Sequence, residues 1–385
     1  MVTVRRVDVA GPGWARRPSG RGFTYLDGDG ERIADRDVVA RIKALAIPPA
    51  WTDVWICPDP CGHIQATGLD DRGRRQYRYH DDWRAARDRA KHDRMIELAR
   101  ALPRLRRRLR RDLSGEGVGR ERVLAGAVRL LELGLFRVGG EGYADDNGSY
   151  GLATLRKGHV RAQGDELRFD YLGKGGQRRI VTIADPDVAE VVRALKRRRG
   201  GGPELLAYKD DRGRWVDVRS SDINGYLQES LGDDFSAKDF RTWTATVLAA
   251  VGLAVEEDDA DDERRRRAAV RRVVRNVARQ LGNTPAVALG SYIDPRVIEH
   301  FEDGRTVGDD LPDARIDAVA EDMLGDDGDA DDSDDEAVAV EGVPEQLVGE
   351  VHAAVADLLD AAPRRTARRR RRGGARDGRS GRGRT

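Results

Sequence analysis

Short runs of alternating apolar and polar residues dominate the first part of the chain. Residues 23–26, 54–56 and 63–67 have the period of strands and are rich in β-branched or aromatic side chains. The last two runs flank the turn sequence CPDPCG, which predicts a hairpin. One short helix is expected over residues 35–45, because two prolines follow it. The pattern predicts a small antiparallel β domain.

From residue 81 onward, the apolar positions recur with the period of an amphipathic helix. A basic helix over 83–102 is predicted to end at Pro103, since proline removes a backbone donor, and a second helix is predicted over 104–112. Further helices are predicted over residues 121–133, 186–197, 220–231, 237–251, 264–281, 284–290 and 294–302. This part of the chain is therefore expected to be mainly helical.

Two alternating segments interrupt the helical pattern. Residues 167–172 and 179–183 are predicted strands, and the glycine-rich sequence GKGGQ between them predicts a hairpin with Lys174 at its tip. The whole pattern predicts an α+β fold, with a small N-terminal antiparallel β domain and a larger, mainly α-helical domain that contains a β-hairpin.

These patterns divide the chain into four parts. Residues 1–20 are rich in Gly, Arg and Pro and are expected to be flexible, whereas residues 21–90 form the β-rich domain and residues 91–307 the helical domain. The tail over residues 308–385 is acidic and then Arg-rich, a composition typical of disorder. One apolar spacing within it predicts a helix over residues 344–361.

Charge is distributed unevenly along the chain. The total is only +1 at pH 7, yet residues 309–336 carry −13, residues 337–363 carry −5 and residues 364–385 carry +10. Residues 1–308 therefore carry +9, which suits a surface that binds a polyphosphate. A solvated surface rich in Arg and Asp would have the same composition, so charge alone leaves both interpretations open.

Cysteine content and hydropathy limit the possible metal sites and cellular compartments. Cys57 and Cys61 lack the second Cys/His pair that a zinc site needs, so no metal is expected, and two thiols in a large chain fit a reducing cytosol. No signal pattern and no apolar run of about 20 residues is visible, which predicts a cytoplasmic protein without a membrane span. A P-loop and a dinucleotide-binding glycine motif are also missing from the sequence.

A tyrosine, two arginines and a lysine lie in distinctive settings and form a candidate catalytic set. Tyr292 follows Gly and Ser in GSYIDP, which would allow close approach of a bulky substrate. Arg137 in LFRVGG and Arg241 in KDFRTW have apolar neighbours, and a guanidinium buried there needs an anionic partner. With Lys174, these groups can attack a phosphodiester without a metal: the phenol attacks, the arginines hold the charge, and the lysine protonates the leaving oxygen. Asn283 could donate to the same phosphate.

Each of these residues also has an ordinary structural interpretation. A tyrosine after a helix is usually a core or surface residue, a single arginine is usually a solvated charge, and a turn lysine is usually only exposed. Asn283 would also suit the N-cap of the helix over 284–290. His159 is expected to be structural or to contact a DNA backbone, and not to act as a base.

Several ordered motifs resemble those of the type IB DNA topoisomerases, in particular the bacterial, poxvirus-like members of this eukaryotic-type topoisomerase I family. The resemblance covers about residues 20–305, and the order and spacing of the motifs agree. It implies that residues 21–90 clamp DNA and that residues 91–307 are a catalytic domain of the tyrosine recombinase/topoisomerase IB type. The catalytic motifs are FRVGGEGYADDNGSYGLATLRKGHV, LGKGGQ, KDFRTW and LGNTPAVALGSYIDP, and those of the smaller domain are IPPAW, VWICPDPCGHIQATG and GRRQYRYH.

Carried over position by position, the resemblance implies a role for each member of the set. Tyr292 would be the nucleophile that forms a 3′-phosphotyrosyl bond. Arg137 and Arg241 would stabilise the transition state, and Lys174 would be the general acid. The viral enzymes have a histidine where this chain has Asn283, a departure that keeps a hydrogen-bond donor.

The resemblance also implies contacts with DNA outside the catalytic set. The N-terminal domain of the family lies over the major groove, where Arg, Gln and Tyr can contact phosphates and base edges. A basic helix face after that segment could follow the backbone, although each such residue could equally be a surface charge. The predicted DNA-binding residues are Arg74, Arg75, Gln76, Tyr77, Tyr79, Arg84, Lys91, Lys157, His159 and Lys238.

The implied function is relaxation of supercoiled DNA by transient single-strand cleavage, strand rotation and religation. Because a covalent ester conserves the bond energy, no ATP is expected to be required, and a divalent metal is expected at most to stimulate. The expected partner is double-stranded DNA, bound by a monomer in the cytoplasm at the nucleoid, without a membrane or an obligate protein partner.

Two other functions stay open. A tyrosine site-specific recombinase shares the phosphate chemistry and the fold of the catalytic domain. Such recombinases usually have a histidine three residues before the second arginine, where this chain has Lys238, and usually a helical N-terminal domain. A non-catalytic DNA-binding protein would need the basic surfaces but not the complete catalytic set. The sequence therefore favours the topoisomerase.

Overall fold

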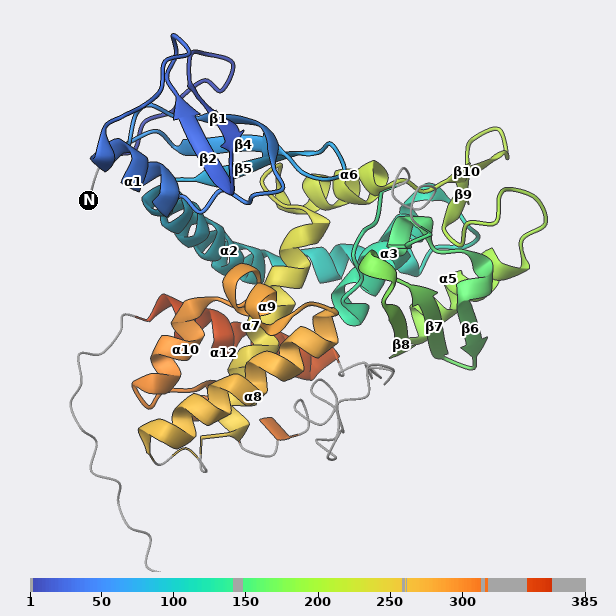
Figure 1. The fold of residues 1–385 in the computed structure, drawn as a ribbon. Helices are drawn as coiled ribbons and strands as arrows, with labels where there is room; N and C mark the ends of the chain where they lie inside the picture. The colour runs from blue at the N-terminus through green and yellow to red at the C-terminus, as the bar shows by residue number, and fades with distance from the viewer. Residues whose placement is uncertain are drawn as a thin grey trace, which may run out of the picture. The chain divides into compact units, whose positions relative to one another are not determined.

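The computed structural model describes residues 3–140, 148–257, 260, 262–312, 316–317 and 345–361. The chain forms two compact units, Met1–Arg94 and Met95–Thr385 (Figure 1). The sequence pattern places the boundary between residues 90 and 91, four residues before this division.

The first unit is built on a five-stranded antiparallel sheet with the strand order β2-β1-β3-β4-β5. Helix α1 (Arg36–Ala44) begins after Asp35, whose side chain accepts two backbone N–H groups of the first turn. Apolar side chains of α1 and of the sheet form the core of the unit, with Ile42, Val54 and Ile56 buried in it. The strands are β1 (Trp14–Ser19), β2 (Gly22–Leu26), β3 (Thr52–Ile56), β4 (Ile64–Leu69) and β5 (Arg75–Tyr79).

The expected flexible segment over residues 1–20 is wrong for the described residues that pair with this sheet. β1 pairs with β2 from Ala15 to Ser19, and its first residues pair with β3. Arg5 donates its N–H to the Cys61 carbonyl (2.8 Å) and accepts from the His63 N–H (2.7 Å). The sequence hides this pairing because both faces of β1 carry an arginine, which breaks the apolar alternation. Arg17 is exposed, whereas Arg16 is half-buried on the other face and donates to the carbonyls of Ile47 and Pro48.

Helix α2 (Asp81–Leu113) continues through Pro103, so the predicted break at that residue is wrong. A proline inside a helix costs about 3 kcal/mol, because one hydrogen bond is lost and the ring crowds the preceding turn. Pro103 is exposed, whereas Leu102, Leu105 and Leu109 are buried. Burial of a leucine contributes about 2 kcal/mol, so packing of these three side chains outweighs the cost of the proline.

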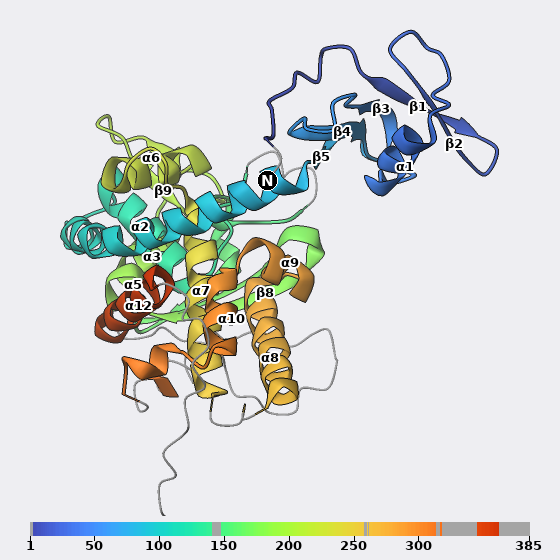
Figure 2. The same cartoon turned by 90° about the vertical axis from the view of Figure 1, so that its left-hand side faces the viewer.

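Helices form most of the second unit. Helix α7 is buried over nearly its whole length and packs against α3, α6, α8, α10 and α12. Figure 2 shows α7 (yellow) running through the middle of this unit, with α8 and α12 on different sides of it. The helices after α2 are α3 (Arg120–Gly134), α5 (Pro186–Arg197), α6 (Ser220–Leu231), α7 (Ala237–Val255), α8 (Glu263–Leu281), α9 (Pro285–Ser291), α10 (Pro295–Glu302) and α12 (Glu345–Asp360).

A three-stranded antiparallel sheet lies at one edge of the second unit (Figure 1). Its strands are β6 (Val160–Gln163), β7 (Glu166–Leu172) and β8 (Arg178–Ala184), of which β7 and β8 are the predicted hairpin. A second hairpin, β9 (Ala207–Lys209) and β10 (Trp215–Asp217), was not predicted. The two units together confirm the α+β class, with a small N-terminal β sheet and a mainly helical remainder.

The helix predicted in the tail belongs to the core of the second unit. α12 packs against α7, α10 and the short 3-10 turn Val307–Asp309. The Nδ1 atom of His352 accepts from Trp243 Nε1 and from Arg106 Nη2, each at 3.1 Å. The rest of the expected tail, apart from residues 308–312 and 316–317, lies outside the described residues.

Candidate active site

Three arginines, from the segment after α3, from β8 and from α7, meet at the C-terminal end of helix α8. Carbonyls at a helix end lack some of their intrahelical donors and carry the partial negative charge of the helix dipole. We call Arg137, Arg179 and Arg241 the carbonyl-held cluster, because each donates to at least one of these oxygens. The bonds run from Arg179 to the carbonyls of Arg279 (3.1 Å) and Gln280, from Arg241 to that of Leu281 (2.7 Å), and from Arg137 to that of Gly282 (3.1 Å).

Gly282 makes this close approach possible. It ends α8 with a φ of 58°, in the left-handed region that favours glycine. A Cβ atom added there would lie 3.0 Å from Arg179 Nη1. The glycine therefore lets the guanidinium reach the helix end and turns the chain from α8 toward Asn283 and α9.

Arg241, on helix α7, is the most deeply buried of the three. It is 4% exposed, and it also donates to the carbonyl of Leu135, which ends α3 in a left-handed conformation. Burial, followed by the neighbouring charge of Arg137, lowers the pKa of Arg241 to about 10 while Tyr292 opposes the shift, so it stays a cation at neutral pH. Backbone carbonyls thus replace the anionic partner that the sequence predicted. The Nε atom has no hydrogen-bond partner among the described residues.

Arg137 and Asn283 form a hydrogen-bonded pair at the same place. Arg137 Nη2 donates to Asn283 Oδ1 at 2.6 Å, and Asn283 Nδ2 is buried without a partner in the described part of the chain. The predicted N-cap role of Asn283 is wrong, because Thr284 accepts from the backbone N–H of Val287 and caps α9. The pair therefore leaves one amide donor free to bind an acceptor from outside.

Tyr292 ends α9 beside this cluster. The centre of its ring lies 5.6 Å from the guanidinium carbon of Arg241. The Thr246 hydroxyl accepts from the Asp294 N–H (3.2 Å), and it lies within hydrogen-bond distance of the Tyr292 carbonyl (3.3 Å) as well as of the Thr242 carbonyl (3.0 Å). Because Arg241 and Thr246 both belong to α7, one helix positions the tyrosine and the arginine nearest to it.

Lys174 lies where the sequence predicted it, on the turn between β7 and β8. Gly175 and Gly176 follow it with φ values of 81° and 77°, and the lysine side chain is exposed. The structure therefore brings Arg137, Arg241, Asn283 and Tyr292 together, whereas Lys174 is connected to them only through its hairpin.

Sequence reasoning missed Arg179 and Tyr171, which form the second strand pair from the turn of that hairpin. They are cross-strand partners in the register of β7 and β8, and both are buried. Burial raises the pKa of the Tyr171 phenol although three nearby arginines oppose the shift, so the phenol stays neutral. The signal was present, because the alternation of β7 points Tyr171 inward and the hairpin pairing then places Arg179 opposite it.

The predicted DNA-binding segment of the first unit is divided by the alternation of β5. Arg75, Tyr77 and Tyr79 lie on its exposed face, where the two tyrosine rings stack with their centres 6.0 Å apart. Gln76 points to the other face and donates to Asp70, which also pairs with Arg74 (2.8 Å). The three residues of the exposed face can therefore bind one surface together, and Gln76 cannot join them without leaving Asp70.

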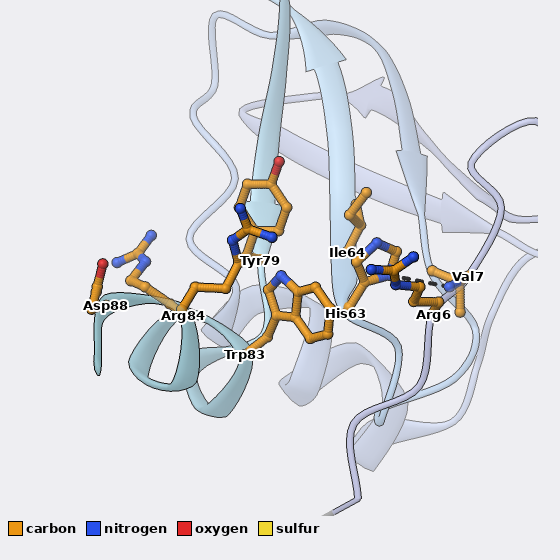
Figure 3. A pocket seen from close by; sticks show the side chains of 9 residues that line it. Arg6, Val7, His63, Ile64, Tyr79, Trp83, Arg84 and Asp88 are labelled. Atoms are coloured by element: carbon orange, nitrogen blue, oxygen red, sulfur yellow. Dashed lines mark hydrogen bonds between the residues drawn. The ribbon is translucent and has the colours of Figure 1, made fainter. Parts of the chain in front are cut away.

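A pocket of about 540 Å³ continues from this face to the first turns of α2. Its lining includes Tyr79 and the predicted contact Arg84, together with Arg6, His63 and Trp83. Figure 3 shows the Trp83 indole beside the His63 ring, and their centres are 4.9 Å apart. Arginines and aromatic rings together are the side chains that bind phosphates and bases of nucleic acids. Lys91 follows on α2 and does not line the pocket.

The remaining predicted DNA contacts lie on the second unit. No hydrogen bond between described residues joins them to the carbonyl-held cluster. Lys157 and His159 belong to one 3-10 turn, where His159 Nδ1 accepts from the Arg156 N–H (3.1 Å) and its ring packs on Tyr150. Lys238 is exposed in the first turn of α7, three residues before Arg241. Their contact with DNA stays a prediction.

The described residues offer neither a metal site nor a membrane-spanning helix. No three His, Cys, Asp or Glu side chains within them come together as a possible metal site, and Cys57 and Cys61 are free thiols. None of the described helices has both the length and the apolar content that crossing a membrane requires.

The sequence matches two protein families. Residues 80–304 match the eukaryotic DNA topoisomerase I catalytic core, and residues 22–70 match the bacterial DNA topoisomerase IB N-terminal domain. The chain is similar to DNA topoisomerase 1B of Acanthamoeba polyphaga mimivirus, with 32% identity over 294 residues that cover 74% of this chain and 87% of that protein. It is also similar to DNA topoisomerase 1 of Mycosarcoma maydis, with 26% identity over 176 residues that cover 42% of this chain and 17% of that protein.

Proposed function

The chain belongs to the type IB DNA topoisomerase family, and from this premise we propose that it relaxes supercoiled DNA through a transient 3′-phosphotyrosyl bond. Neither ATP nor a metal ion is required. The observation that carries the proposal is the buried donor set at the end of α8. Arg241, Arg137 and the unpaired Nδ2 of Asn283 meet there next to Tyr292, whose side chain bonds with Arg241.

Tyr292 is the nucleophile in this proposal. Its phenolic oxygen forms a bond to the scissile phosphorus and gives up its proton to solvent, while the bond from phosphorus to the 5′ oxygen breaks. Lys174 gives a proton to that departing oxygen. Religation is the reverse, since the freed 5′ hydroxyl attacks the phosphotyrosine. The ester conserves the energy of the broken bond, so no nucleotide has to be hydrolysed.

Arg137, Arg241 and Asn283 stabilise the phosphate as negative charge spreads over its oxygens. Two guanidiniums can hold both nonbridging oxygens, and they cost little reorganisation because the helix end already fixes them. Asn283 supplies an amide donor where viral relatives have a histidine. The physical support is that all three side chains carry hydrogen-bond donors at one place. No carboxylate among the described residues pairs with them there, since the nearby Asp294 pairs with Arg296.

The first unit supplies contacts to duplex DNA away from the scissile bond. Arg75, Tyr77 and Tyr79 on the exposed face of β5, with Arg84 beside them, bind the DNA backbone and base edges. The chain acts on DNA as a monomer in the cytoplasm. These contacts position the duplex, whereas the second unit carries the chemistry.

The alternative of a tyrosine recombinase is less well supported. Lys238 occupies the position where recombinases usually have a histidine, and the N-terminal unit is a β sheet and not a helical domain. A non-catalytic DNA-binding protein would have no use for a neutral amide donor buried beside a tyrosine and two arginines.

The test is relaxation of supercoiled plasmid in EDTA without ATP, with Tyr292→Phe as the matched variant. We expect relaxation by the parent protein, no relaxation by Tyr292→Phe, and a covalent protein–DNA adduct only with the parent. A parent protein that does not relax the plasmid would overturn the proposed function. Relaxation that is unchanged in Tyr292→Phe would overturn the role of Tyr292, and joined products from two DNA sites would favour the recombinase.

A further inference from the structure

Arg179 is a buried cation that the proposed chemistry does not use. It is 8% exposed, and it bridges the carbonyls of Arg279 and Gln280 at the end of α8. Its further partner is the hydroxyl of Tyr171. Burial lowers the pKa of Arg179, Tyr171 opposes this shift, and the charge of Arg137 adds to it. Burying the Arg179 guanidinium near that of Arg137 costs free energy. An apolar side chain could fill the same space without that cost, so a purely structural role does not explain the arginine.

The position of Arg179 in the hairpin connects it to Lys174. Arg179 is the second residue of β8, five residues after Lys174, and it pairs with Tyr171, which lies three residues before Lys174. The backbone of Gly173, next to Lys174, packs on the Arg179 stem, since an added Cβ there would lie 3.1 Å from Arg179 Cγ. Two glycines with positive φ follow Lys174, so the turn itself has little stiffness of its own. The strand pairs beside the turn, Tyr171 with Arg179 among them, must therefore set where the tip lies.

The guanidinium of Arg179 reaches the end of α8, where Arg137 and Arg241 are also held. Its two carbonyl acceptors directly precede Leu281 and Gly282, which accept from Arg241 and Arg137. A planar guanidinium carries five N–H donors on three nitrogens, so it can bridge two carbonyls and a hydroxyl that are spread apart, whereas the three donors of an ammonium all lie on one nitrogen. Arg179 is thus a rigid link between the hairpin and the helix end.

We propose that Arg179 is a positioning residue that holds the Lys174 hairpin against the end of α8, so that the lysine reaches the leaving oxygen of the phosphate held by Arg137 and Arg241. The inference rests on the proposed function of Lys174 as the general acid. Arg179 does not touch the substrate; it acts through Lys174.

The experiment measures single-turnover cleavage of a DNA duplex by Arg179→Met, with Arg178→Met as the matched control. Arg178 is adjacent on β8, but it is exposed and pairs with Asp170. We expect Arg179→Met to cleave about 100-fold more slowly, since misplacement of a catalytic group by about 1 Å has an effect of this size. Arg178→Met should cleave at the parental rate. Arg179→Lys, which keeps the charge but not the bridge, should be intermediate.

A second substrate separates positioning of the general acid from a general loss of structure. It carries sulfur in place of the 5′ oxygen at the scissile phosphate, and a thiol, with a pKa of about 8.5 when free, leaves as an anion without a proton. We expect Arg179→Met and Lys174→Ala both to cleave this substrate within about threefold of the parental rate. Equal slowing of both substrates by Arg179→Met would overturn the proposal.

The double variant gives an independent answer. If Arg179 acts only through Lys174, then Lys174→Ala with Arg179→Met should be no slower on ordinary DNA than Lys174→Ala alone. A further loss of about 100-fold in the double variant would overturn the inference. A parent protein that forms no covalent adduct with either substrate would instead refute the proposed function, so the two failures are distinguishable.

Discussion

The second unit contains two clusters of buried arginines that are compensated in different ways. In the first, Arg106 and Arg129 pair with Glu132 at 2.6 and 2.7 Å, and Arg129 also pairs with Asp185 at 3.0 Å. Burial alone would raise the pKa of Glu132, but Arg106 and Arg129 outweigh it and lower the pKa to about 2. We call Arg106, Arg129, Glu132 and Asp185 the carboxylate-paired cluster.

The carbonyl-held cluster has no such compensation. Arg137, Arg179 and Arg241 donate to backbone oxygens, and within the described ranges none of them lies at ion-pair distance from a carboxylate. Helix-end carbonyls carry only partial charges, so the guanidiniums repel one another, and burial and this repulsion lower the pKa of Arg241 to about 10.

At the end of α8, the second unit keeps buried cations that have no carboxylate partner among the described residues. A cluster that brings its own carboxylates is complete in the free protein and serves the fold. A cluster that lacks them is completed only by an anion from outside, which the proposed function identifies as the scissile phosphate. Substitutions in the first cluster should therefore affect stability, and substitutions in the second should affect the reaction.

The largest effect is expected for Arg129→Met in the carboxylate-paired cluster. It leaves Glu132 and Asp185 buried beside fewer cations, and breaking a buried pair in this way costs about 3–5 kcal/mol. Denaturant unfolding should show this loss, whereas the cleavage rate of the protein that stays folded should be unchanged. Arg100→Met, which breaks the exposed pair with Asp360, is the control and should cost less than about 1 kcal/mol. Equal losses in both variants would contradict the comparison.

Arg241→Met should have the opposite profile. Loss of one preorganised donor slows a reaction by about 10²–10³-fold, which single-turnover cleavage would measure. The free energy of unfolding should be unchanged or higher, because the variant removes a buried cation that repels its neighbours. A strong destabilisation with normal cleavage by the folded fraction would show that Arg241 serves the fold after all.

Acid should affect the first cluster through His352, which contacts Arg106. Burial and then Arg106 lower the pKa of His352 to about 3, with Glu132 opposing. Because this histidine is neutral when folded and titrates near 6.5 when unfolded, its contribution is complete above pH 6.5 and is lost as the pH falls toward 3. Between pH 6.5 and 5 the loss is about 1.6 kcal/mol. His352→Asn should unfold with a flatter pH dependence in that range, and an identical pH dependence would refute this assignment.

The smallest expected effect is stabilisation by sulfate. An anion that completes the carbonyl-held cluster should raise the unfolding free energy of the parent by about 1 kcal/mol at a few times its Kd. Thermal unfolding with sulfate should show a smaller shift for Arg241→Met than for the control Arg178→Met. Identical shifts in the two variants would place the anion elsewhere.

Much of the fold follows from local patterns, and its errors have a common cause. The predicted strands around residues 54–56 and 63–67 exist, and so do the predicted helices of the second unit. Pro103 is misjudged because distant packing outweighs a local penalty. The helix α12 is placed correctly along the chain, but its burial against α7 depends on partners about 100 residues away, such as Trp243 for His352.

The sequence by itself determines which chemical groups are present and in what order, since Arg137, Lys174, Arg241 and Tyr292 lie in motifs that indicate the family. Only the tertiary structure decides which groups share one place. The bond from Arg137 to Gly282 spans 145 residues, and the bond from Arg241 to Leu135 spans 106. Periodicity reports burial within one element, not the partner across the core. For this reason the sequence was enough to predict Tyr292 as the nucleophile, whereas the contacts of Arg179 with the carbonyls at the end of α8 could be identified only from the fold.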